Sequence, residues 1–242
     1  MIVTTTAISF IFLSFGLAFC GGWFLGALRR SGEFKSDKRI GVLIGFFFFV
    51  YAIHSLILGL ATLFAFSNPN YIYLVCIIIS NILITGLAIL GSYTVFYIFF
   101  PRIRRINVFS YSLILGIGIL ATLASFAENP QPLVMINGSF DFNHKPLFSF
   151  LIWFLGFVSI GSPLYIFGRL FIFAKNRELK LLSGIITILA SLGVANISVR
   201  LLQFLPLSVF FRDKFFDIGA AFVGIVFVIS LFFLSFSRNK VS

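Results

Sequence analysis

Charged residues, cysteine and histidine are all scarce in this chain. Only 10% of its 242 residues are charged, and it has seven acids, two cysteines and two histidines. A soluble domain carries roughly a quarter of its residues as charged side chains, so the composition excludes an ordinary soluble enzyme or nucleic-acid-binding domain. Cys20 and Cys76 both lie in apolar runs, which argues against a disulfide. Paired histidines, GxSxG and P-loop motifs are missing as well, and we therefore predict no enzyme, no metal site and no cofactor.

Long apolar runs make up most of the sequence. Hydrophobic residues account for 60% of the chain, 36 residues are Phe, and the mean hydropathy is +1.11. A helix needs about 20 residues to cross a hydrocarbon core of about 30 Å. Seven runs satisfy this length, at 4–28, 40–66, 71–100, 107–127, 148–173, 181–207 and 214–236. We predict an all-α polytopic membrane protein, a single domain over residues 1–242 with a bundle of seven transmembrane helices.

The basic residues are distributed unequally between the two sides of the predicted membrane. Fourteen of the 18 fall on one side, in the loops 29–39, 102–105 and 169–180 and in the tail 238–240. Cytoplasmic loops of membrane proteins carry an excess of Lys and Arg. The sequence therefore predicts an N-terminus outside, a cytoplasmic C-terminus and contact with anionic lipid, in a bacterial cytoplasmic (inner) membrane.

The longest connection, residues 128–147, lies on the outer side between the fourth and fifth spans. Asn137 and Gly138 form a turn pair flanked by LVMI and SFDF, which is typical of a small β-hairpin. The triplet Asn137-Gly138-Ser139 also matches a glycosylation sequon, and we favour the turn.

Six polar residues interrupt the apolar spans and are the candidate site residues. They are His54, Asn81, Asn196, Arg200, Gln203 and Asp217. An ionisable group in hydrocarbon costs at least about 2.5–3.5 kcal/mol, so it usually faces the bundle interior and finds a partner. Residues 196, 200 and 203 share one helical stripe, and Arg200 and Asp217 fall at similar depths on antiparallel spans. We expect these two to form a salt bridge or to share a water-filled recess that opens outward.

Each candidate also has a purely structural interpretation. Arg200 and Asp217 fit a structural ion pair as well as a ligand site. Asn81 and Asn196 fit ordinary interhelical hydrogen bonds. For His54 we favour structural hydrogen bonding near Asn81, ahead of a protonation or ligand role, with metal binding last because His144 is the only other histidine.

Small residues predict where helices approach each other closely. Asn81, Thr85, Ala88 and Ser92 form a polar-to-small stripe on the third span. Gly22 and Gly26 in the first span, like Ala220 and Gly224 in the seventh, have the spacing that permits close helix packing.

Three segments carry a resemblance to a known family. They are FYIFFPRIRR (96–105), PLFSFLIWF (146–154) and AKNRELKLLSGIITIL (174–189). Together with the seven spans, they resemble the seven-transmembrane N-terminal sensor region of bacterial histidine kinases. Members usually continue into PAS, dimerisation and kinase domains, whereas this sequence stops at SRNKVS. The resemblance implies a sensor or receptor-like module in signal transduction, without its own output domain and with a separate cytoplasmic signalling protein as partner.

A second interpretation comes from the layout of the spans. Residues 4–66 resemble residues 148–207, since each has a span, a basic loop and a span, with His54 and Asn196 lying 15 and 16 residues past the last basic residue of the loop. This 3+1+3 organisation is similar to that of small-solute transporters of the SWEET type. A structural subunit of a membrane complex is a third possibility.

Overall fold

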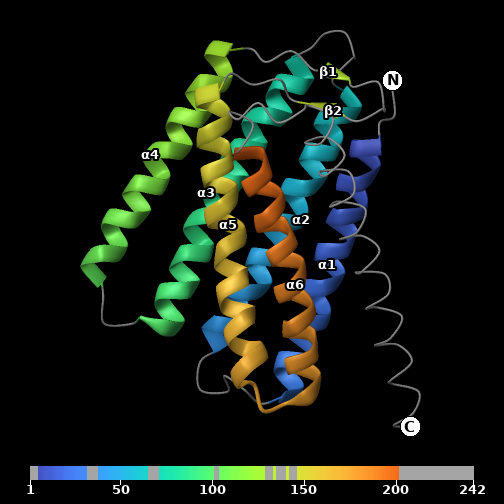
Figure 1. Ribbon diagram of the computed structural model, residues 1–242, viewed down its shortest axis with the longest axis vertical. Coiled ribbons are helices and arrows are strands. Elements are labelled where there is room, and N and C mark those ends of the chain that lie inside the picture. The colour runs from blue at the N-terminus through green and yellow to red at the C-terminus, as the bar shows by residue number, and fades with distance from the viewer. Residues whose placement is uncertain are drawn as a thin grey trace.

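Long helices form the body of the computed structural model (Figure 1). The structure describes residues 5–31, 38–64, 71–100, 104–128, 133–134, 140–141 and 146–201. Within these ranges there are six helices: α1 (Thr5–Ser31), α2 (Lys38–Phe64), α3 (Tyr71–Phe99), α4 (Arg104–Glu128), α5 (Pro146–Phe173) and α6 (Arg177–Leu201).

All six helices are long and apolar enough to cross a membrane. The first five predicted spans and the start of the sixth are thus confirmed as helices, and the chain is a multi-pass integral membrane protein. The predicted seventh span, 214–236, and the end of the sixth lie outside the described residues. Helix α6 begins at Arg177, four residues before its predicted start, because Asn176 caps it. The Asn176 Oδ1 accepts a hydrogen bond of 3.0 Å from the backbone N–H of Leu179.

Two short strands lie between α4 and α5. Strands β1 (Leu133–Val134) and β2 (Phe140–Asp141) pair antiparallel, with Leu133 opposite Asp141 and Val134 opposite Phe140. The predicted Asn137-Gly138 turn lies outside the described residues. We call this end of the bundle, where α2 and α4 finish and α3 and α5 begin, the strand end.

Five of the helices form a closed ring. Neighbours around the ring are α1, α2, α3, α5 and α6, and α6 in turn contacts α1. Helix α4 packs on α3 and α5 at the edge of this ring (Figure 1). The connection from the third to the fifth helix therefore passes outside the ring, through α4.

Aromatic side chains fill the half of the ring away from the strand end. Phe24 of α1, Phe48 of α2 and Phe167 of α5 lie in mutual contact, with ring centroids 4.9–6.3 Å apart, and Phe24 and Phe167 meet edge to face. Leu179 and Leu182 of α6 belong to the same buried cluster. Edge-to-face aromatic pairs contribute about 0.5–1.5 kcal/mol beyond the area they bury.

The outer surface of the bundle is strongly apolar. On α4 the exposed side chains include Val108, Phe109, Leu113, Ile119 and Leu123. A contiguous apolar surface of this kind is unfavourable in water and favourable against lipid tails. The bilayer is therefore the partner of this surface.

Candidate functional site

Polar side chains gather inside the bundle in the half nearer the strand end. His54 of α2, Ser80, Asn81 and Thr85 of α3, and Ser125 of α4 are each at most 7% exposed. Their hydrogen bonds join the three helices α2, α3 and α4. We call these five residues the polar network.

His54 is buried on the side of α2 that faces α3. Its Nδ1 is 3.3 Å from the Ser80 hydroxyl oxygen. The hydroxyl donates to Nδ1 when the imidazole carries its proton on Nε2, and accepts from Nδ1–H in the other tautomer. The Tyr51 ring, one turn away on α2, stacks on the imidazole with centroids 6.1 Å apart. His54 is buried and forms an interhelical hydrogen bond, as its structural interpretation predicts, but its partner is Ser80, whereas the side chain of Asn81 bonds Ser125 of α4.

Asn81 connects α3 to α4. Its side-chain Nδ2 donates a hydrogen bond of 2.7 Å to the Ser125 hydroxyl oxygen, and that hydroxyl donates to the Ala121 carbonyl at 3.1 Å. Each hydroxyl has one proton to donate, so Ser125 accepts from one helix and donates within its own. Asn81 thus forms the interhelical hydrogen bond that its sequence context predicts.

The α3–α4 interface is closest one turn further along α3. A Cβ built on Gly118 of α4 would overlap the Cγ2 and Oγ1 of Thr85 and lie 2.8 Å from its Cβ. The Thr85 hydroxyl is itself held by a hydrogen bond of 2.7 Å to the Asn81 carbonyl. Three residues of the predicted stripe on α3, Asn81, Thr85 and Ala88, are buried, whereas the fourth, Ser92, is only partly buried.

The close approach predicted at Gly22 and Gly26 is not found among the described residues. A Cβ on Gly22 would meet none of their atoms within 4 Å, and on Gly26 it would meet only the guanidinium of Arg30 in the same helix. Tight contacts of α1 with α2 lie instead at Gly21, where a Cβ would come within 2.7 Å of the Phe48 Cβ, and at Gly45 and Gly59 of α2. The pair Ala220 and Gly224 lies outside the described residues.

The remaining predicted site residues are not placed relative to the polar network. Asn196 and Arg200 lie in the last two turns of α6, and their side chains are outside the described structure. Gln203 and Asp217 lie outside the described residues altogether. The expected Arg200–Asp217 pair therefore stays a prediction.

Sequence reasoning missed Ser80 and Ser125 as partners. A single serine is common in membrane helices and does not by itself predict an interhelical hydrogen bond. The adjacent pair Ser80-Asn81, within an otherwise apolar run, could have indicated one. It also missed an ion pair at the opposite end of the bundle, where Arg30 of α1 bonds Glu178 of α6 through both carboxylate oxygens, at 2.5 and 3.3 Å. Both charges suit their helix ends, a cation at a C-terminus and an anion at an N-terminus.

The polar network offers an imidazole, an amide and three hydroxyls, groups that hydrogen-bond to each other or to a polar ligand. Among the residues that the structure describes, no three His, Cys, Asp or Glu side chains come close enough to hold a metal ion. No protein-family model, curated protein or solved structure matches this chain at a significant level. The interpretation of the site rests on its own geometry.

Proposed function

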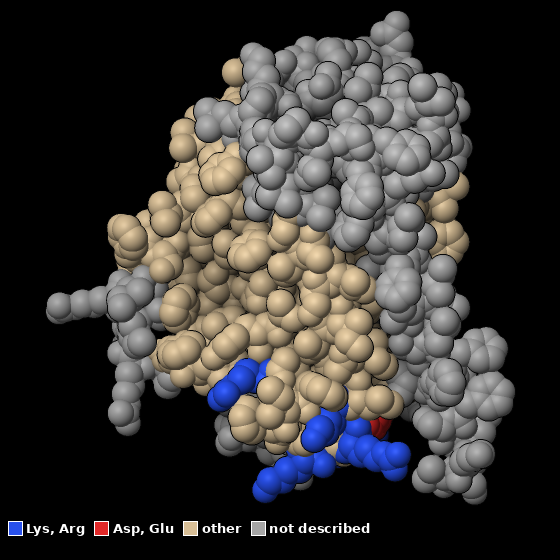
Figure 2. Space-filling model, viewed as in Figure 1, with Lys and Arg blue, Asp and Glu red and all other residues tan. Residues whose placement is uncertain are grey.

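We propose that this chain is a sensor or receptor-like membrane module that perceives a ligand or a state of the membrane and signals through a cytoplasmic protein. In this proposal the chain crosses the membrane seven times, with its N-terminus outside, its C-terminus in the cytoplasm, and a β-hairpin in the outer loop between the fourth and fifth spans. Support for the direction comes from the basic residues, which the described helices bring to one end of the bundle (Figure 2). We call it the basic end: Arg29, Arg30, Arg39, Arg169, Lys175, Arg177 and Lys180 lie there.

The attachment of α4 is the observation that carries the proposal. This helix packs at the edge of the ring, exposes a broad apolar surface, and is joined to α3 through the polar network. A change in the lipid, or a polar ligand that competes for the Asn81–Ser125 hydrogen bond, would shift α4 against α3. Interhelical hydrogen bonds in membranes contribute only about 0.6–1.7 kcal/mol, so such a shift lies within reach of a ligand's binding energy.

In this proposal such a movement reaches the cytoplasmic partner through the basic end. There the ring is filled by the Phe24, Phe48 and Phe167 cluster and joined by the Arg30–Glu178 ion pair. A helix displaced at the strand end transmits its movement to this end because helices are stiff along their axes.

A partner search tests the proposal directly. The tagged protein is crosslinked in its own membranes and purified, and the proteins that recur with it are identified. A recurrent cytoplasmic signalling protein is the expected result. Its output is then compared between Asn81→Ala and a matched control, Thr187→Ala, which removes a hydroxyl bonded only within α6 to the Ser183 carbonyl. Recovery of no cytoplasmic protein, or an equal response in both variants, would overturn the sensor proposal.

The outward recess needs its own test, because its side chains lie outside the described structure. If Arg200 and Asp217 are paired, Arg200→Ala alone destabilises the protein more than the double change to alanine at both positions, since a single buried charge is the costly species. Additive effects in this double-mutant cycle would rule out the pairing and leave a shared water-filled recess as the remaining alternative.

A small-solute transporter of 3+1+3 organisation is the second candidate. The peripheral position of α4 favours it, since a linker between two halves belongs outside the helices that it joins. The α1–α2 and α5–α6 pairs are also the two most extensive helix contacts, as the repeat of span, basic loop and span would suggest. Solute uptake by vesicles containing the purified protein would support this candidate. If only integral membrane proteins co-purify and no uptake is seen, the third candidate, a structural subunit of a membrane complex, is favoured.

A further inference from the structure

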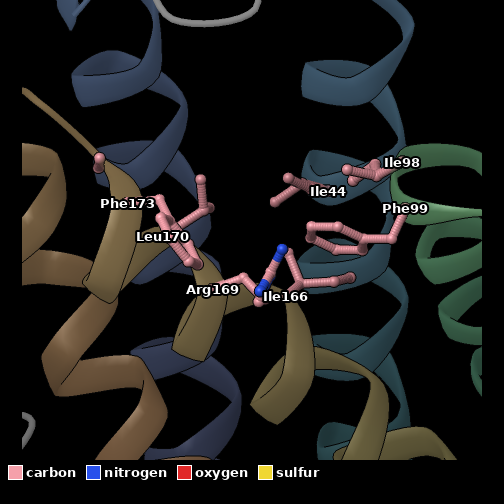
Figure 3. Close-up of a pocket in the computed structure, with 8 residues that line it drawn as sticks. Ile44, Ile98, Phe99, Ile166, Arg169, Leu170 and Phe173 are labelled. Carbon is pink, nitrogen blue, oxygen red and sulfur yellow. The ribbon is translucent and has the colours of Figure 1, made fainter.

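An apolar pocket lies at the basic end, between α2, α3 and α5 (Figure 3). Its volume is about 240 Å³. The apolar lining consists of Ile44 from α2, Ile98 and Phe99 from α3, Ile166, Leu170 and Phe173 from α5, and Ala174, which directly follows α5. Pockets for drug-sized molecules run from about 300 to 1,000 Å³, so this one suits a narrower, flexible occupant.

Arg169 supplies the one charged side chain among the residues that line the pocket. Its Cζ lies 4.4 Å from the centroid of the Phe173 ring and 5.6 Å from that of Phe99. Figure 3 shows the guanidinium beside the Phe99 ring, and Ile98 and Ile44 lie close to that ring. Aromatic faces attract a guanidinium and hold its plane, while its N–H groups remain able to bind an anion at their edge.

No carboxylate of the described residues pairs with Arg169. The acid that the structure describes at the basic end is Glu178, and it is bonded to Arg30. Arg169 is exposed and lies one turn before the end of α5. A long basic side chain near the end of a membrane-spanning helix extends toward the headgroups. An arginine at this position beside an apolar pocket matches a molecule with a negative head and an apolar tail.

We propose that this pocket binds an anionic phospholipid of the leaflet at the basic end, with the lipid phosphate on Arg169 and part of one acyl chain along the apolar lining. Charge complementarity favours this occupant, because further cations surround the same end of the bundle and attract anionic lipid. The guanidinium then forms paired, charge-assisted hydrogen bonds with the phosphate. This inference concerns a different end of the protein from the polar network and does not depend on the proposed function.

Native mass spectrometry of the delipidated protein in detergent tests the site. The probes are phosphatidylglycerol, phosphatidylcholine with the same acyl chains, and inorganic phosphate, each titrated separately. We expect the first phosphatidylglycerol to bind more tightly than further copies of the same lipid and more tightly than either of the other two probes. Arg169→Gln should weaken that first binding event about tenfold, equivalent to ~1.4 kcal/mol. Arg169→Lys should restore part of the loss, because it keeps the charge but not the paired hydrogen bonds.

Two controls separate the pocket from general attraction between charges. Arg177→Gln removes the same charge from the same end, on α6 and outside the pocket lining, and should leave the first binding event unchanged. Ala174→Leu narrows the pocket and should weaken phosphatidylglycerol binding although Arg169 is intact. Equal losses in Arg177→Gln and Arg169→Gln would overturn the proposal. So would binding of inorganic phosphate with the same affinity as the lipid, because the acyl chain would then contribute nothing.

Discussion

Two glycines of α4, two residues apart, should respond oppositely to the same substitution. At Gly118 an added Cβ overlaps Thr85 of α3, whereas at Gly116 it meets no atom of the described residues within 4 Å. Thr85 cannot easily move aside, because it is β-branched and its hydroxyl is bonded to the Asn81 carbonyl. Gly118→Ala should therefore force α4 away from α3.

The magnitude follows from three contributions. Overpacking costs about 1–3 kcal/mol, a lost Thr85 hydrogen bond within α3 adds about 0.5–1.5, and the higher helix propensity of alanine returns about 0.8–1. We expect Gly118→Ala to lower the free energy of unfolding by about 1–3 kcal/mol. Gly116→Ala should leave it unchanged or raise it by up to ~1 kcal/mol.

Unfolding by SDS in dodecyl maltoside micelles, followed by tryptophan fluorescence, measures both variants. Thr85→Ala in the Gly118→Ala background removes the two overlapping atoms, Cγ2 and Oγ1, and should recover most of the loss. If Gly118→Ala lowers the free energy of unfolding no more than Gly116→Ala does, α3 and α4 are not in close contact at Gly118. The hydrogen bond proposed between Asn81 and Ser125, one turn away on α3, would then be contradicted as well.

Two further changes probe the polar contacts by the same unfolding assay. Ser125→Ala leaves the Asn81 amide without its acceptor and should lower the free energy of unfolding by about 1–2 kcal/mol. A double-mutant cycle with Asn81→Ala should give a coupling energy of about 0.6–1.7 kcal/mol. A coupling energy of zero would contradict the hydrogen bond. Arg30→Ala should cost only about 0.2–1 kcal/mol because both partners are partly exposed, at 47% and 34%, and the loss should shrink in high salt. An unaltered loss in 1 M salt would show that Arg30 acts through packing and not through Glu178.

The sequence was sufficient to predict the six described helices, because each of these spans is a continuous apolar run bounded by polar or proline-containing segments. The α6 start was misplaced because hydropathy begins at Leu181, whereas the helix begins with the polar turn that Asn176 caps. His54 and Asn81 were recognisable since an imidazole and an amide are costly in lipid and must turn inward.

Partner choice and helix order were harder to predict. The Asn81–Ser125 bond depends on α4 packing against α3, and the Arg169 pocket depends on α2, α3 and α5 meeting at one end. Spacing within one helix carries no information on which neighbour covers each face. The glycines illustrate this: Gly21 lies in contact with α2, whereas Gly22, which has the four-residue spacing from Gly26, does not.

The closed ring also has a consequence for how the protein is made. Helix α1 contacts α2 early, but α6, its other neighbour among the described helices, begins more than a hundred residues later, and the pair Arg30–Glu178 is separated by 148 positions. At a synthesis rate of roughly 5–20 residues per second, α1 waits about 7–30 s for that neighbour. During this interval the α6-facing side of α1 lies open to lipid and to other helices. Among the described helices, the last step of assembly is therefore the closure of α6 onto α1, and it is the step of theirs at which a competing membrane helix would do the most damage.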